Sequence, residues 1–114
     1  LGLINTSYKQ AMDQELYKKF YMHNTGHWLG LDVHDPSEYK EDTELVKLKA
    51  GMIFTVEPGL YIRAHKSVSK RFHNIGIRIE DDILVTTKGP EVLTSNVPKS
   101  IKEIENLMGG SSSG

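Results

Sequence analysis

The 114-residue sequence contains no cysteine. This absence excludes a disulfide framework, a zinc site built on thiolates and a cysteine nucleophile. Any metal ion bound here must therefore be held by imidazole and carboxylate groups. The sequence also lacks an excess of charge of one sign, since 14 Lys and Arg residues stand against 15 Asp and Glu, a net charge of −1. A chain this close to neutral carries no electrostatic signature for nucleic acid or an acidic membrane surface.

Long apolar runs are absent as well. No window approaches the roughly 18 uninterrupted apolar residues that a membrane-spanning helix requires. The opening residues, LGLINTSYKQ, have neither the basic start nor the apolar stretch of a secretory signal, which favours a cytoplasmic location. The first residue is not Met, so an upstream part is expected. The composition, 38% hydrophobic and 25% charged, excludes collagen-like and fully disordered classes, and the length allows one domain at most.

Residues 1–108 are predicted to form part of an α+β domain dominated by antiparallel strands. Residues 109–114 (GGSSSG) are predicted to be a flexible Gly/Ser tail or an added sequence. A helix is predicted over Ser7–Tyr21, because Ser7 and Gln10 form a capping-box pattern ahead of apolar residues that recur every four positions. A second capping box, Ser100 with Glu103, predicts a short helix near the C-terminal end.

Strands are predicted in the middle of the sequence. The segment MIFTVEPGLYI, residues 52–62, reads as a strand that Pro58 and Gly59 interrupt with a bulge or bend. A polar, basic loop is expected over residues 63–74. The segment IGIRIEDDILVTT, residues 75–87, reads as one strand whose alternation places Arg78 and Glu80 on the same face. A turn at residues 87–90 then leads to a hairpin partner, EVLT.

Three segments place titratable residues in apolar surroundings. They are HNTGHWLGLDVHD at residues 23–35, Glu57 in TVEPG and Glu80 in RIEDD. Burying a carboxylate costs several kcal/mol unless a cation or a hydrogen-bond donor compensates for the lost hydration. Two such carboxylates on separate strands, with histidines nearby, suggest a cation that they share.

Ordinary structural roles compete with this interpretation. A single Glu in a strand usually faces solvent. His23 and His27 are four residues apart, which would place both on one helix face, although Gly26 argues against a helix there. Surface or turn roles are favoured over metal binding for a further set of residues: Asp32, Asp35, His65, His73, and Asp81 with Asp82, which continue an acidic run from Glu80 that ordinarily faces solvent. Spacing alone leaves a carboxylate–histidine metal site and these alternatives evenly balanced.

The motifs HNTGHWLGLDVHD, GMIFTVEPGLYI and IGIRIEDDILVT, in this order, resemble the C-terminal part of the Xaa-Pro aminopeptidases (aminopeptidase P). These enzymes and the related prolidases share the pita-bread fold with methionine aminopeptidases. The resemblance runs from about Phe20 to Met108 and favours aminopeptidase P over prolidase. One departure is Asn24, where the family more often has Gly after the first histidine.

The resemblance implies two divalent metal ions, usually Mn²⁺, held by two aspartates, one histidine and two glutamates. It assigns the histidine to His27 and the glutamates to Glu57 and Glu80, and it places the two aspartates in an upstream segment. A donor set of carboxylates and one imidazole suits manganese. The resemblance also implies that Glu57 moves the proton during the reaction, and it implies roles for four further residues. These residues are His23 and His34, which contact the substrate and the developing charge, Tyr61, which supports the substrate site, and Arg78, which lies beside the acidic ligands.

The implied activity is release of the N-terminal residue from peptides that have proline in the second position. Such an enzyme acts with the upstream part of the same catalytic domain, and the isolated chain is expected to be inactive without it. A homo-oligomer is left open. Two alternatives are prolidase, which cleaves only dipeptides, and a non-catalytic pita-bread binding module. Such modules lose metal ligands, whereas His27, Glu57 and Glu80 are all present here.

Overall fold

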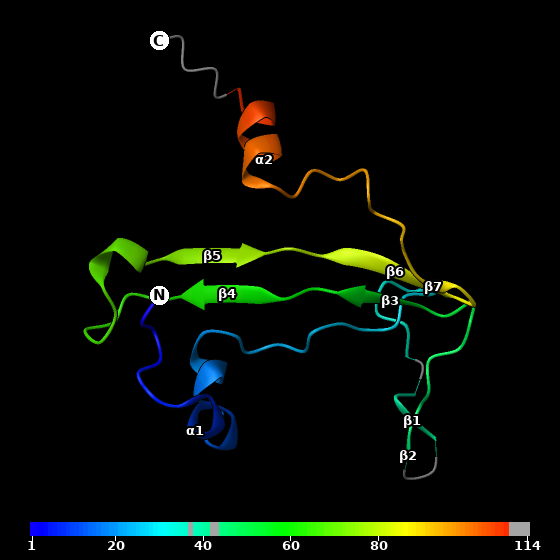
Figure 1. Ribbon diagram of the computed structural model, residues 1–114, viewed down its shortest axis with the longest axis horizontal. Helices are drawn as coiled ribbons and strands as arrows, with labels where there is room; N and C mark the ends of the chain where they lie inside the picture. The colour runs from blue at the N-terminus through cyan, green and yellow to red at the C-terminus, as the bar shows by residue number, and fades with distance from the viewer. Residues whose placement is uncertain (37, 42–43, 110–114) are drawn as a thin grey trace. The chain divides into compact units, whose positions relative to one another are not determined.

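The computed structural model describes residues 1–36, 38–41 and 44–109. It combines short helices with antiparallel strands (Figure 1), which confirms the predicted α+β class. Most of the predicted tail, residues 110–114, lies outside the described residues. Among the helices in the described part, none has both the length and the hydrophobicity needed to traverse a lipid bilayer. The chain divides into two compact units, Leu1–Gly26 with Glu57–Glu80 and His27–Val56 with Asp81–Gly114, which we call unit 1 and unit 2.

Unit 1 begins with helix α1, Tyr8–Asp13, followed by the 3₁₀ helix η1, Leu16–Lys19. The predicted Ser7 cap is confirmed, because its side chain accepts a hydrogen bond from the backbone N–H of Gln10. The Gln10 side chain does not complete a capping box, since it accepts from the Thr6 hydroxyl instead. The predicted helix over Ser7–Tyr21 is wrong in its length. Glu15 adopts a left-handed conformation with φ of 52°, which ends the α-helical ladder between the two elements.

The early end of α1 has a physical cause in its packing. Tyr8 and Met12, which lead the predicted apolar stripe, are 81% and 44% exposed, and α1 contains no buried residue. A short helix gains most of its stability from packing an apolar face, so this segment lacks the contacts that would extend it. Phe20, the last residue of the stripe, is buried and anchors the segment to the core of unit 1.

The remainder of unit 1 is an antiparallel hairpin of β4, Gly59–Ile62, and β5, Ile75–Arg78. The connecting loop contains the 3₁₀ helix η2, Lys70–Phe72. The core of the unit consists of three buried residues with four partly buried neighbours. They are Phe20, Ile62 and Val68, surrounded by Leu3, Ile4, Leu60 and Phe72.

Unit 2 contains a three-stranded antiparallel sheet in the order β3-β6-β7. Strand β3 is Ile53–Val56, β6 is Asp81–Thr86 and β7 is Gly89–Val92. The predicted hairpin partner is confirmed as β7, although it begins at Gly89 rather than after Pro90. A small hairpin of β1, Lys40–Glu41, and β2, Glu44–Leu45, precedes β3 in the sequence.

Helix α2, Ile101–Leu107, follows the sheet of unit 2. Its predicted capping box is confirmed: the Ser100 hydroxyl accepts from the Glu103 N–H, and the Glu103 carboxylate accepts from the Ser100 N–H over 3.0 Å. This reciprocal pair satisfies two donors that the first helical turn would otherwise leave without partners.

The two longer predicted strands are each divided. The expected interruption at Pro58 separates β3 from β4. The segment 75–87, which was predicted as one strand, is also broken, because Ile79 and Glu80 lie between β5 and β6. The backbone N–H of Ile79 donates instead to the carbonyl oxygen of Pro58 over 3.2 Å. The interruption at Pro58 therefore has a counterpart on the neighbouring segment, and it places Glu57 and Glu80 beside the two breaks.

Candidate metal centre

Glu57 and Glu80 occupy matching positions next to the ends of two paired strands. Strand β3 ends at Val56 and β6 begins at Asp81, and these two residues are partners in the antiparallel register. Glu57 therefore follows β3 directly and Glu80 precedes β6 directly, which brings the two glutamates to the same end of the ladder. The Glu57 backbone N–H donates to the carbonyl oxygen of Thr25 over 2.6 Å. This contact fixes the backbone from which the Glu57 side chain projects.

His27 is held by a reciprocal pair of hydrogen bonds to β3. Its backbone N–H donates to the Thr55 hydroxyl over 3.0 Å, and its carbonyl oxygen accepts from the Thr55 N–H over 2.9 Å. Thr55 is only 2% exposed, so this anchor is protected from water. The Nδ1 atom of His27 lies 2.9 Å from the carbonyl oxygen of Trp28. Because a carbonyl oxygen only accepts, Nδ1 carries the proton and the lone pair of the neutral ring is on Nε2.

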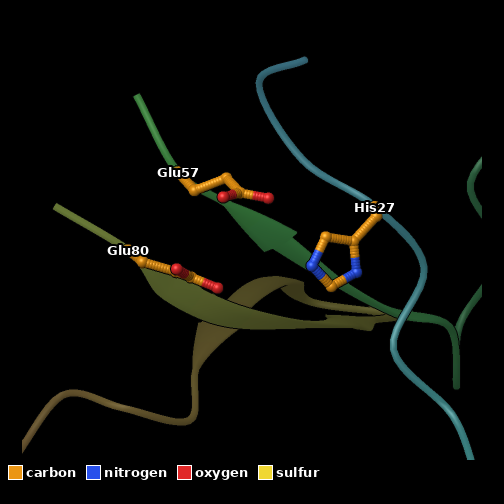
Figure 2. Close-up of side chains that lie close together, drawn as sticks. All are labelled: His27, Glu57 and Glu80. Carbon is orange, nitrogen blue, oxygen red and sulfur yellow. The ribbon is translucent and has the colours of Figure 1, made fainter. Parts of the chain in front are cut away.

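His27, Glu57 and Glu80 each offer one ligand atom, and these three atoms lie within 4.8 Å of one another. Figure 2 shows the imidazole ring and the two carboxylates pointing toward one another. Glu57 is buried, His27 is half-buried and Glu80 is exposed. A hydrogen bond from Nδ1 to a carbonyl oxygen is the usual outer contact of a histidine that binds metal through Nε2. The donor set of one imidazole and two carboxylates therefore fits a divalent cation.

Arg78 connects the buried carboxylate to a second polar group. Its Nη1 lies 3.3 Å from Oε2 of Glu57, and its Nε donates to the Tyr61 hydroxyl over 2.9 Å. The hydrogen bond to Tyr61 raises the pKa of Arg78, and the negative charges of Glu57 and Glu80 raise it further. A buried carboxylate is costly without a charged partner, so Arg78 offsets part of the cost of placing Glu57 here.

His23 extends this network. Its Nδ1 lies 2.8 Å from the carbonyl oxygen of Asn24, and its Nε2 lies 2.8 Å from the Tyr61 hydroxyl. Since the carbonyl oxygen requires a donor, the neutral ring carries its proton on Nδ1. The Tyr61 hydroxyl then donates to Nε2 of His23 and accepts from Nε of Arg78. The result is one continuous chain from His23 through Tyr61 and Arg78 to Glu57.

Two predicted site residues differ in how they are held. Both ring nitrogens of His23 have protein partners, so direct contact with a substrate would require His23 to exchange one of them. His34 is exposed, and its ring centroid lies 4.4 Å from that of His27 at an interplanar angle of 54°. His34 is therefore the more accessible of the two histidines that were predicted to contact the substrate.

The structure also bears on the ordinary structural roles that were considered for the histidines and for the acidic run. No helix contains His23 or His27, so their spacing has no helical meaning. Asp81, considered as part of a solvated acidic run, is half-buried and accepts from the Thr94 hydroxyl over 2.6 Å. The Thr94 bond and the neighbouring ammonium of Lys99, at 2.9 Å, lower the pKa of the Asp81 carboxyl. Asp81 therefore supports the chain next to Glu80 rather than facing solvent alone.

Sequence reasoning missed two supporting residues. Thr55 anchors His27, and only its place in the apolar run before Glu57 hints at a buried position. Gly59 was interpreted as part of a bend, but a Cβ atom at this position would lie 2.7 Å from the ring of Tyr61. The absence of a side chain at Gly59 therefore allows Tyr61 to reach Arg78 and His23.

Comparison with known proteins gives consistent matches. Residues 1–87 match metallopeptidase family M24. The Xaa-Pro aminopeptidase of Haemophilus influenzae is 47% identical over 95% of the chain and 25% of that protein. The Xaa-Pro aminopeptidase of Escherichia coli is 46% identical over 95% of the chain and 24% of that protein. The chain thus spans about a quarter of the length of these relatives.

Solved structures agree with this result. The chain superposes on Pseudomonas aeruginosa aminopeptidase PepP with a TM-score of 0.90, at 50% identity over 95% of the chain and 25% of that structure. It superposes on aminopeptidase P from Escherichia coli with the inhibitor Pro-Leu with a TM-score of 0.86, at 46% identity over 95% of the chain and 24% of that structure. These matches confirm the predicted fold, a part of a pita-bread catalytic domain.

Proposed function

Since the chain belongs to metallopeptidase family M24, we propose that it supplies part of the active site of an Xaa-Pro aminopeptidase. The proposed reaction releases the N-terminal residue from peptides with proline in the second position. The observation that carries the proposal is the approach of His27, Glu57 and Glu80 to within 4.8 Å. The identity to Xaa-Pro aminopeptidases over nearly the whole chain supports the choice of substrate class.

His27, Glu57 and Glu80 would hold divalent cations together with two aspartates from the rest of the catalytic domain. M24 proteins are metallopeptidases, and the predominance of oxygen donors here favours Mn²⁺ over softer ions. A bound cation would supply Lewis-acid activation of the scissile carbonyl and of water. The cytoplasmic location is also part of the proposal, and fractionation of cells that express the tagged protein tests it.

The residues of this chain contribute positioning and proton transfer. Glu57 would accept a proton from the attacking water and pass it to the proline nitrogen as the peptide bond breaks. Its Oε2 atom is directed by Arg78 at 3.3 Å, which leaves the orientation of the carboxylate fixed during this transfer. A proton relay needs a carboxylate that keeps its position, because misplacement by about 1 Å can cost about a hundredfold in rate.

The two remaining histidines would act on the substrate side. His34 is exposed beside His27 and would donate a hydrogen bond to the carbonyl oxygen as negative charge develops there. His23 would act through Tyr61, to which it is already hydrogen-bonded. The tertiary amide of an Xaa-Pro bond has no N–H, so recognition must rest on the shape of the proline ring and on the free N-terminal amine.

Hydrolysis of a tripeptide with proline in the second position, measured on the complete protein, tests this function. We expect release of the first residue in the presence of Mn²⁺ and its loss after metal removal. Cleavage of Xaa-Pro dipeptides without cleavage of the tripeptide would identify a prolidase instead. Metal binding without hydrolysis of either peptide would identify a non-catalytic module, and both results would contradict the proposal.

A further inference from the structure

The two units carry opposite charge, although the whole chain is almost neutral. Unit 1 contains eight Lys and Arg residues against four Asp and Glu, whereas unit 2 contains six against eleven. The positive charge of unit 1 is concentrated in the loop between β4 and β5, residues 63–74 (yellow-green in Figure 1). This loop contains four Lys and Arg residues, two histidines and no acidic residue. Such a local excess of one sign attracts ligands of the opposite sign.

The basic loop is held in place by packing and hydrogen bonds. Val68 is 6% exposed and belongs to the core of unit 1, and Phe72 packs against the same core. Nε2 of His73 lies 2.9 Å from the carbonyl oxygen of Val68 and 3.2 Å from that of His65. These contacts fix the loop backbone, so its basic side chains project from a defined framework. A binding site gains affinity when its groups are held in place before the ligand arrives.

A cavity of about 410 Å³ lies where this loop meets the segment after α1. Its lining consists of three basic and three apolar residues, which are Lys19, Arg63 and His65 with Phe20, Met22 and Ala64. None of these lining residues is acidic. Nζ of Lys19 donates to the Ser67 hydroxyl over 3.4 Å, and that hydroxyl lies 2.7 Å from Nδ1 of His65. The side chains of Lys19 and His65 are therefore linked through the Ser67 hydroxyl.

We propose that this cavity binds a phosphate group. An Arg guanidinium pairs with two phosphate oxygens at once, and a Lys ammonium acts as a compact charge beside them. The two cationic side chains, Arg63 and Lys19, match a dianion better than the single charge of a carboxylate, and His65 adds a ring N–H as a further hydrogen-bond donor. Phe20, Met22 and Ala64 add an apolar wall, so a phosphate monoester with an apolar body should bind more tightly than inorganic phosphate. This site is distinct from the metal centre, and the proposal does not depend on the peptidase function.

Calorimetric titration of the complete protein with inorganic phosphate and with phenyl phosphate tests the proposal. Metal is first removed with a chelator, so that neither probe can bind through a metal ion. We expect saturable binding of both probes, with phenyl phosphate the tighter. Arg63→Gln and Lys19→Gln should each weaken binding by about tenfold or more, which is the effect of losing one charged hydrogen bond. A lower affinity in both variants would show that the probes bind in this cavity.

Lys102→Gln is the matched control, because Lys102 is an exposed lysine on α2 in unit 2. It should leave the affinity unchanged. An equal loss of affinity in this variant would show that the effect is general charge screening, and this would overturn the proposal. Heats of binding from chloride that equal those from phosphate at matched ionic strength would overturn it for the same reason. Benzoate that binds as tightly as phenyl phosphate would overturn the assignment to phosphate. Amide chemical shifts at residues 19 and 63–67 that do not change on phosphate addition would also contradict it.

Discussion

The Nε atom of Arg78 donates a hydrogen bond to the hydroxyl of Tyr61 over 2.9 Å. This single contact joins two parts of the candidate site, because Arg78 also lies beside the Glu57 carboxylate and Tyr61 also contacts His23. The contact lies within the β4–β5 hairpin, where Gly76 rather than Arg78 is the register partner of Tyr61. The side chains therefore reach diagonally across the hairpin, and the geometry depends on both of them.

Replacement of Tyr61 by Phe should lower kcat/KM of the complete enzyme by about tenfold or more, since a hydrogen bond to a charged group is worth about 1.5–3 kcal/mol. The change removes the hydroxyl that orients Arg78 and His23 and keeps the ring that packs over Gly59. Steady-state kinetics with a tripeptide substrate measures the effect. Because Tyr61 acts through its neighbours, we expect the decrease mainly in kcat, with the metal content unchanged.

Arg78→Lys is the second variant of this network. A lysine carries one ammonium group and cannot reproduce two directed contacts from a planar fork, so it should restore only part of the activity lost in Arg78→Gln. Arg71→Lys provides a control, because Arg71 stacks on Phe72 in the basic loop away from this network. Full activity in Arg78→Gln would show that Glu57 does not need its charged partner.

Replacement of Glu80 by Gln should remove one metal ligand and leave the shape of the side chain unchanged. We expect activity to fall by more than about a hundredfold, because even the loss of an outer contact to a metal ligand costs 10–100-fold. Metal content, measured by mass spectrometry after dialysis, should fall in parallel. Glu91→Gln, an exposed position on β7, is the control and should change neither quantity. Retention of both metal and activity in the Glu80 variant would refute its assignment as a ligand.

Features that depend on nearby residues could be predicted from the sequence. Both helix caps were correct, since Ser7 with Gln10 and Ser100 with Glu103 interact within one turn. The break at Pro58 was also predicted, because proline cannot donate to a strand ladder. The second break was missed: it depends on a hydrogen bond from Ile79 to Pro58, which are distant in sequence. The length of α1 was overestimated because periodicity does not reveal that its apolar face has no partner in this unit.

The candidate site likewise combines features that could be predicted from the sequence with features that could not. His27, Glu57 and Glu80 could be selected from the sequence because carboxylates in apolar strands and the three motifs point to them. The network around them could not, since the Tyr61–His23 contact and the space over Gly59 follow from the pairing of β4 with β5. Residue types and motifs thus selected three groups that the structure brings together, and tertiary geometry determined what surrounds them.

The stability of α2 should depend on pH through Glu103. Hydrogen bonds from the Ser100 hydroxyl and from the backbone N–H groups of Ser100 and Lys99 lower the pKa of the Glu103 carboxyl. A lowered pKa in the folded state means that the cap stabilises the helix above the ordinary Glu pKa of about 4.3. This contribution is lost as the pH falls through the lowered value. Amide hydrogen exchange in α2 at neutral and acid pH measures the change.

Glu103→Gln separates this effect from general acid unfolding. The amide can still accept a hydrogen bond but does not titrate, so the acid-dependent loss of protection in α2 should largely disappear. Glu105→Gln is the control on the same helix, and its pH dependence should match that of the unmodified chain. Unchanged acid sensitivity in the Glu103 variant would contradict the role of the capping box.

Replacement of Ile62 should destabilise unit 1 in proportion to the volume removed. Ile62 is 2% exposed and lies at the centre of its core with Phe20 and Val68. We expect a loss of about 0.5–1.5 kcal/mol for Ile62→Val and about 2–5 kcal/mol for Ile62→Ala. Chemical denaturation of the complete protein measures both. Equal effects of the two variants would show that the site tolerates a cavity and that this cluster is not the core.

The isolated 114-residue chain should have little or no peptidase activity. His27, Glu57 and Glu80 form only part of the ligand set that the family resemblance implies, and an incomplete set binds divalent cations weakly. Addition of the remainder of the catalytic domain as a separate polypeptide should restore Mn²⁺-dependent cleavage of a tripeptide with proline in the second position. Restoration should fail when the 114-residue chain carries Glu80→Gln. Robust hydrolysis by the isolated chain, free of any full-length enzyme, would instead mean that these three ligands suffice for catalysis.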